Sequence, residues 1–306
     1  MTTASPDVLI AGLASRQYGV FSRTQARELG AGRNFIKTRL ATGRWVRVEH
    51  NVFRLNGTTP TWRQSLLIAC LSWGSGAAIS HRAAGSLWRL AGIERQIVEL
   101  TVALNRRGGG AGIVHRNRLE GVDVEIFDGI RVTSVARTLI DLAAVLRPET
   151  LEEVFDDALI KGLVSIPRIR WRLSEIAGGK GRHGVLLVRQ LLEDRQKYGV
   201  PRSIFETRML RLLKRSGLPR PERQYKVHDI GNKRFAAIDF AFPSQKIGIE
   251  TDGFQWHSGK ARWQSDRSRR NWLTKLGWRL IHVTWDDLNG SPEEVVETIG
   301  RLLIPG

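Results

Sequence analysis

The chain has 306 residues, of which 42% are hydrophobic and 25% are charged, and its formal net charge is +18. This length and apolar content predict folded domains with two or three cores and exclude a disordered polyelectrolyte. The basic excess makes nucleic acid the expected partner, and the solubility of a generally basic protein is the alternative explanation.

Cysteine usage and hydropathy exclude further classes of protein. The single cysteine, Cys70, lies in an apolar run over 66–71 and rules out an internal disulfide or a cysteine-based zinc cluster. The chain does not begin with a basic and then apolar leader, and no apolar stretch reaches about 18 residues. We therefore expect a cytoplasmic protein with no membrane partner.

Residues 1–57 predict three short helices followed by a two-stranded wing. Ser22 is a candidate N-cap for a helix over 23–29, a basic helix follows over 33–42, and a hairpin pattern covers 45–55. This is the order of a winged helix-turn-helix, in which the third helix enters the major groove of DNA. An interaction module of the same size is the alternative. The predicted nucleic-acid contacts are Arg33, Lys37, Arg39 and Arg47.

Residues 58–200 predict a central α+β region. His81 follows Ser80 at a predicted helix start, where a structural hydrogen bond is favoured over catalysis. Arg137 and Asp141 are one helical turn apart and predict an ion pair. The pattern predicts helix over 61–95, strands near 98–103, 112–115, 122–127 and 130–132, and helices near 134–146, 149–161, 165–176 and 184–197.

Residues 201–306 predict a small α/β sandwich with a mixed sheet, in the order helix, three strands, long helix, strand and helix. Ser203 and Glu206 form a candidate capping box at the first helix. The long helix over 260–276 ends at Gly277, a suitable residue for a helix C-terminus.

Strand periodicity predicts where Asp239 points. In the strand over 235–242, Ile238, Phe240 and Phe242 share one face, and Asp239 lies on the other. The next strand carries Glu250 on the face opposite its isoleucines.

Asp252 shares the face of Glu250, and the linker over 243–245 is short enough for a hairpin. Pairing of the two strands would bring Asp239, Glu250 and Asp252 to one end of a sheet. Clustered carboxylates repel one another unless a hard cation such as Mg²⁺, or alternatively Mn²⁺, binds among them. The alternative is a set of solvated carboxylates on an edge hairpin. No Rossmann fingerprint, serine elbow or zinc signature indicates a small-molecule enzyme.

The first half resembles the AbiEi-type antitoxin family of abortive-infection systems over about residues 6–160. The winged-helix pattern, the motif Ser80-His81-Arg82-Ala83-Ala84 and the run from Ile130 to Ala143 carry this resemblance. It implies an N-terminal DNA-binding module like that of a transcriptional repressor. It also implies a cognate toxin or another protein as a partner.

Residues 201–303 resemble the DUF559 family and, more distantly, the very-short-patch-repair endonucleases, within the PD-(D/E)XK superfamily. Three stretches carry this resemblance: Ile238-Asp239-Phe240, the run from Ile249 to His257, and the run from Asp266 to Arg270 before Gly277-Trp278. The resemblance implies a restriction-endonuclease-like domain that hydrolyses phosphodiester bonds of DNA in defence or repair.

The same resemblance implies roles for single residues. Asp239, Glu250 and Asp252 resemble metal ligands. Glu206 resembles an acidic residue that acts through metal-bound water, with helix capping as its rival role. His257 resembles a catalytic histidine that moves a proton of the attacking water, with a structural role as the alternative.

The chain departs from the family pattern at Asp252, where a lysine is expected two residues after Glu250. His257, Lys246 or Lys260 would then have to supply the missing positive charge. Otherwise the nuclease domain is degenerate and the protein is a non-catalytic, antitoxin-like transcriptional regulator.

The long basic helix offers phosphate contacts that would make DNA affinity salt-dependent. A solvated helix face explains the same residues. The predicted contacts are Lys260, Arg262, Arg267 and Arg270, with Arg269 beside them.

Overall fold

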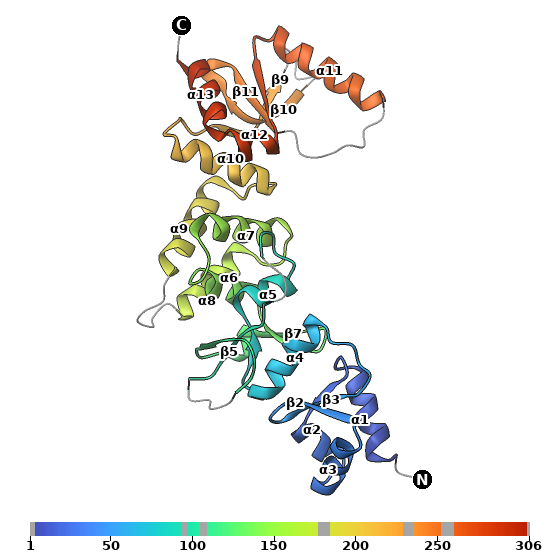
Figure 1. Cartoon of the computed structure of the whole chain (residues 1–306). Coiled ribbons are helices and arrows are strands. Elements are labelled where there is room, and N and C mark those ends of the chain that lie inside the picture. Colours follow the sequence, from blue (N-terminus) through green and yellow to red (C-terminus); the bar gives the residue numbers. More distant parts are fainter. Residues whose placement is uncertain are drawn as a thin grey trace. The chain divides into compact units, whose positions relative to one another are not determined.

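The computed structural model contains two compact units, Met1–Val200 and Pro201–Gly306 (Figure 1). It describes residues 4–93, 97–104, 109–176, 184–228, 235–251 and 260–304, and of residues 260–267 it describes only the backbone. Within these ranges, no helix is both long enough and apolar enough to cross a bilayer.

Three helices and a three-stranded sheet open the first unit. Ser22 caps the second helix as predicted, because its Oγ accepts from Gln25 N while Gln25 Oε1 accepts from Ser22 N. One strand was not predicted: residues 20–22 pair with the second wing strand, and the sheet order is β1-β3-β2. The elements are α1 Pro6–Ser15, β1 Val20–Ser22, α2 Arg23–Glu28, α3 Arg33–Ala41, β2 Trp45–Glu49 and β3 Val52–Leu55.

A five-stranded sheet with the order β6-β5-β4-β8-β7 follows. Its central strand corrects the prediction of continuous helix over 61–95, because Ala78 and Ile79 form a strand between two helices. Both residues are fully buried, and two residues are too few for strand periodicity to appear in the sequence. The elements are α4 Trp62–Trp73, β4 Ala78–Ile79, α5 His81–Leu87, β5 Glu99–Val102, β6 Ile113–Arg116, β7 Val124–Phe127 and β8 Ile130–Thr133.

Four helices complete the first unit and agree with the predicted ones to within a few residues. They are α6 Val135–Leu142, α7 Pro148–Ile160, α8 Ile166–Ile176 and α9 Val185–Tyr198. The first strands of the chain also belong to the core that follows them, since Val20 and Val52 pack in one cluster with Leu66 and Leu100. The division predicted between residues 57 and 58 stays a prediction.

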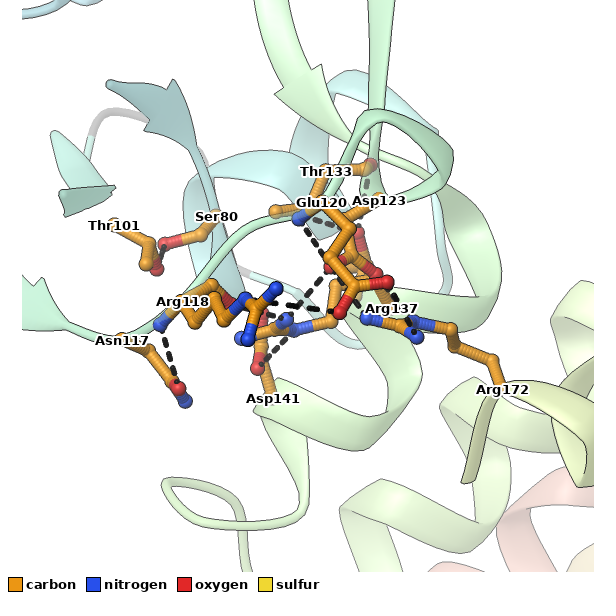
Figure 2. Close-up of polar contacts among 11 residues, drawn as sticks. Ser80, Thr101, Asn117, Arg118, Glu120, Asp123, Thr133, Arg137, Asp141 and Arg172 are labelled. Atoms are coloured by element: carbon orange, nitrogen blue, oxygen red, sulfur yellow. Dashed lines mark hydrogen bonds and ion pairs between the residues drawn. The ribbon is translucent and has the colours of Figure 1, made fainter. Parts of the chain in front are cut away.

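A buried ionic network joins α6 to the loop before β7 and to α8 (Figure 2). Arg137 donates from Nε to Asp141 Oδ1 at 2.8 Å, as predicted, and from Nη1 to Asp123 Oδ2 at 3.0 Å. Arg172 donates to the other Asp123 oxygen at 2.6 Å. Burial opposes ionisation of Asp123, but hydrogen bonds from Arg172 and the Glu120 backbone keep its pKa below the ordinary value. Asp123 and Arg137 are fully buried, and Arg137 Nη2 and Asp141 Oδ2 are buried without a hydrogen-bond partner among the described residues.

The second unit is an α/β sandwich with the mixed sheet that was predicted. Its sheet order is β12-β11-β10-β9, with β11 and β12 parallel and the other neighbours antiparallel. The elements are α10 Ile204–Arg215, β9 Glu222–His228, β10 Phe235–Phe242, β11 Ile247–Thr251, α11 Lys260–Lys275, β12 Arg279–Val283, α12 Trp285–Gly290 and α13 Pro292–Leu303.

Helices cover both faces of this sheet. Side chains of α10 and α13 pack with Ile247 and Ile249 on one face, and Leu273 of α11 packs on the other. Gly248 faces the α11 side, where a Cβ would lie 2.6 Å from Leu280 Cδ2. A side chain at this position would have to displace Leu280 or the buried Ile238.

Candidate active site

The sheet of the second unit opens into a fork at Asp239. The ladder between β10 and β11 runs from the pair Phe242 and Ile247 to the pair Phe240 and Ile249. Beyond it, Asp239 Oδ2 accepts from Thr251 N at 2.9 Å and from Thr251 Oγ1 at 2.7 Å. A carboxylate therefore binds the neighbouring strand where backbone pairing has ended. We call this region the fork.

The fork corrects the predicted alternation of β10. Ile238 packs with Leu273 of α11, whereas Phe240 and Phe242 pack with Phe205 of α10 on the opposite side of the sheet. The simple alternation fails between Ile238 and Phe240 because β10 leaves the regular ladder there. The prediction that these three residues share a face is wrong.

Gln224 of β9 links two carboxylates at the fork. Its Nε2 donates to Asp239 Oδ1 at 3.0 Å and to Glu206 Oε1 at 3.4 Å. Its backbone is in the left-handed region, with φ of 51°. Sequence reasoning did not find Gln224, because its neighbourhood depends on the pairing of β9 with β10.

Glu206 is buried near the start of α10 and is 4% exposed. Ser203 Oγ accepts from Glu206 N at 3.2 Å, which confirms Ser203 as the N-cap. The carboxylate does not complete the predicted capping box, since Glu206 Oε2 accepts from Arg202 N at 3.0 Å instead. Arg223 Nη2 lies 3.5 Å from the same oxygen. Glu206 is therefore oriented toward the fork, and the capping-box prediction is wrong for its side chain.

Glu250 lies in a positively charged setting. Arg269 of α11 donates from Nη2 to Glu250 Oε1 and to the Ala237 carbonyl, each at 2.5 Å. His282, which is opposite Glu250 in the parallel register, places Nε2 3.9 Å from Glu250 Oε2. His282 was missed by sequence reasoning. From the sequence, Arg269 was predicted only as a phosphate contact. Its place in the basic helix near the Glu250 strand could have indicated a contact with Glu250.

Lys246 does not supply the charge missing at position 252. Its Nζ donates to the Leu276 carbonyl at 2.9 Å, and it precedes β11 at the end opposite to Glu250. Asp252 and His257 lie outside the described residues, as do the side chains of Lys260, Arg262 and Arg267. Arg270 is exposed.

The described donors suit a hard divalent cation. Asp239 and Glu250 offer carboxylate oxygens, the ligands that Mg²⁺ and Mn²⁺ prefer. Three hydrogen bonds occupy Asp239, which leaves about one of its roughly four acceptor positions for another partner.

The basic side chains of the N-terminal helices differ in their surroundings. Arg33 and Lys37 of α3 and Arg47 of β2 are exposed. Arg39 instead forms three hydrogen bonds with Asp7 of α1, of which the one from Nε to Oδ1 is 2.9 Å. These bonds hold the pKa of Asp7 below its ordinary value. Arg39 therefore joins α3 to α1.

Family comparisons assign both ends of the chain. Residues 205–303 match the model of the restriction-endonuclease-like family REase_MTES_1575. The C-terminal unit contains a restriction-endonuclease-like domain. Residues 9–56 match AbiEi_4, described as a transcriptional regulator and AbiEi antitoxin. The AbiEi-like resemblance is confirmed over residues 9–56, and the restriction-endonuclease-like resemblance is confirmed over residues 205–303.

Similar full-length proteins occur in Mycobacterium tuberculosis. The uncharacterized proteins MT2308 (strain CDC 1551 / Oshkosh) and Rv2248 (strain ATCC 25618 / H37Rv) are each 28% identical over 211 residues. The alignment covers 67% of this chain and 75% of theirs. The crystal structure of the RV2827C protein from the same organism aligns with 15% identity and a TM-score of 0.38, over 60% of this chain and 75% of that one.

Proposed function

We propose that the protein is a metal-dependent DNA endonuclease whose active site is the fork. The observation that carries this proposal is the position of Asp239 and Glu250 on neighbouring strands where the ladder ends. The match of residues 205–303 to a restriction-endonuclease-like family supports it, because folds of this type generally use divalent metals.

Asp239, Glu250 and Asp252 would hold Mg²⁺, with Mn²⁺ as a substitute. When bound, the cation would polarise the scissile phosphate and lower the pKa of the attacking water. Thr251 and Gln224 orient Asp239 by hydrogen bonds to both of its oxygens. Glu206 Oε1 and His257 are the proposed sites for the proton of the attacking water.

Arg269 compensates in this proposal for the lysine that Asp252 replaces. Its contact with Glu250 brings a permanent positive charge to the strand that carries the family motif. An arginine retains this charge at any physiological pH. The same guanidinium binds the Ala237 carbonyl, so the side chain is held from two sides.

DNA binding would come from basic side chains of both units. The N-terminal region would act as a winged helix with α3 in the major groove, with Arg33, Lys37 and Arg47 as contacts and Arg39 holding α3 in place. The basic helix of the second unit would contact phosphates. Its proposed contacts are Lys260, Arg262, Arg267 and Arg270.

A plasmid-nicking assay with Mg²⁺ or Mn²⁺ tests the activity. We expect the wild-type protein to cleave DNA, and Asp239→Ala to slow cleavage on the order of 1,000-fold. Glu297→Ala is the matched control, because this exposed carboxylate of α13 pairs with Arg301 away from the fork. The proposal is lost if the wild type cleaves neither single-stranded nor double-stranded DNA, or if Asp239→Ala retains full activity.

A second candidate is a non-catalytic regulator with a cognate toxin as partner. The description of the family that matches residues 9–56 favours it, together with Asp252 in place of lysine. Mg²⁺ and Mn²⁺ should raise the melting temperature of an active nuclease through binding to the native state. Tight promoter binding without such a shift would support the regulator instead.

A further inference from the structure

Three polar side chains converge in the first unit, outside the fork. His81 is the first residue of α5, Glu99 begins β5 and His115 lies on β6. One ligand atom from each lies within 4.8 Å of the other two. Glu99 is fully buried and His81 is 6% exposed, while the His115 side chain is 27% exposed. We call these residues the His-Glu-His cluster.

The strand pairing brings the cluster together. Ser80 N donates to the Glu99 carbonyl at 3.0 Å, which places the start of α5 beside β5. The parallel register of β5 and β6 sets Thr101 opposite His115. His81 adopts a left-handed backbone with φ of 49°, a conformation that is strained for a residue with a Cβ. Such strain is concentrated at functional sites.

The imidazole of His81 is fixed by a hydrogen bond at one of its two nitrogens. Its Nδ1 lies 2.8 Å from Ser80 Oγ, which also accepts from Thr101 Oγ1 at 2.8 Å; Figure 2 shows Ser80 and Thr101 side by side. When Nδ1 donates to Ser80, Nε2 carries the free lone pair. Such a hydrogen bond orients metal-binding histidines in many proteins.

The Glu99 carboxylate is held by contacts to both of its oxygens. Arg82 donates to Glu99 Oε2 from its backbone N at 3.0 Å and from Nε at 3.1 Å. Glu99 Oε1 accepts from Arg82 Nη2 at 3.2 Å and lies 2.7 Å from His115 Nε2. A metal ion bound to Glu99 Oε1 and His115 Nε2 would replace the hydrogen bond between these two atoms.

We propose that the His-Glu-His cluster is a binding site for a divalent transition metal of the zinc class. Two imidazoles and one carboxylate are the donors that such ions select, with a fourth position open. In a tetrahedron with bonds of about 2.0 to 2.1 Å, the ligands of Zn²⁺ lie roughly 3.3 Å apart. The ligand atoms of the cluster lie within 4.8 Å of one another, so their side chains would move closer together when the metal binds.

The ring planes identify the side chain that moves. His81 and His115 stack with centroids 3.5 Å apart and planes 17° apart, so their lone pairs do not yet converge. His115 is the more exposed of the two and turns on binding. Arg82 already balances the charge of Glu99, so the site lacks the negative excess on which Mg²⁺ depends. The cluster therefore selects Zn²⁺ over Mg²⁺.

The test measures zinc bound to the full-length protein after treatment with EDTA, addition of Zn²⁺ and extensive dialysis. We expect one zinc ion per wild-type chain, retained in excess Mg²⁺, and visible absorption of tetrahedral Co²⁺ when cobalt replaces zinc. His115→Asn should weaken zinc binding on the order of 100-fold or more. His81→Asn should do the same, and asparagine tolerates the left-handed backbone at this position.

Two controls separate this site from folding and from the fork. His50→Asn removes an exposed histidine of the wing turn and should retain zinc. Asp239→Ala should also retain zinc, even where it abolishes cleavage, so failure of the proposed nuclease function does not affect the result. Circular dichroism confirms the fold of each variant. The proposal is overturned if the wild type keeps no zinc, or if His81→Asn and His115→Asn both keep it.

Discussion

The two units use carboxylates in opposite ways. In the first unit, Asp123 and Arg137 are fully buried and each binds more than one charged partner. In the second, Glu250 is 13% exposed and its partner Arg269 is 32% exposed. Buried ion pairs are lost at great cost when one partner is removed, whereas partly exposed groups can exchange partners. The comparison indicates that the ion pairs of the first network are fixed, whereas those of the fork are open to exchange with another partner.

The largest effect on stability is expected from Arg137→Met. This change leaves Asp123 and Asp141 buried without the guanidinium that joins them. The free energy of unfolding should fall by about 3 to 5 kcal/mol. Urea denaturation of the full-length protein measures the loss. A change below 1 kcal/mol would contradict the structural role of the network.

Arg269→Gln should reverse that pattern, with a small loss of stability and a large loss of activity. If Arg269 supplies the charge at Glu250, kcat should fall roughly 100- to 1,000-fold. Arg269→Lys should restore part of the rate, because it restores the charge without the planar group. The matched variant Arg270→Gln, at the exposed neighbouring position, should raise KM and leave kcat near the wild-type value. Equal kcat for wild type and Arg269→Gln, in a wild type that cleaves DNA, would exclude this role.

Thr251→Val tests whether the fork depends on its side-chain hydrogen bond. The change removes the donor to Asp239 Oδ2 but keeps the backbone donor and the shape of the side chain. A hydrogen bond to a charged group contributes about 1.5 to 3 kcal/mol, so stability and kcat should both decrease. Thr251→Ser retains the hydroxyl and serves as the control. Indistinguishable kinetics of the valine and serine variants would show that the backbone bond suffices.

The smallest expected effect is on how the stability of the first unit depends on pH. Burial raises the pKa of Asp141 to about 6, although Arg137 opposes the shift. Asp141 therefore contributes stability that is complete below its unfolded pKa of 3.8 and is lost as pH rises through about 6. Asp141→Asn should remove about 2 kcal/mol of this dependence between pH 4 and 7. Unfolding curves at several pH values, compared with those of Glu297→Gln, measure the difference; parallel curves for wild type and Asp141→Asn would contradict it.

Local patterns in the sequence predicted many elements of the fold. Ser22 and Ser203 were recognised as N-caps, and the Arg137–Asp141 pair followed from helical spacing. The order of the C-terminal elements predicted the mixed sheet. These features depend on residues within a few positions of one another, where sequence periodicity is informative.

Non-local pairing decided the remaining features. Ala78 and Ile79 became the central strand of a sheet because β5 and β8 lie on either side, and a two-residue strand has no periodicity of its own. The Gln224 contact required the register of β9 against β10. These features arise from segments distant in the sequence.

The sequence by itself determined the chemical character of the protein: a basic chain with AbiEi-like and restriction-endonuclease-like motifs, and with aspartate where a lysine is expected. Only the tertiary structure decided which charges meet. Arg269 reaches Glu250 from another element, and His81 meets Glu99 and His115 across two strands. Spacing along a chain constrains neighbours within a helix or strand, whereas distances between elements follow from packing and strand register.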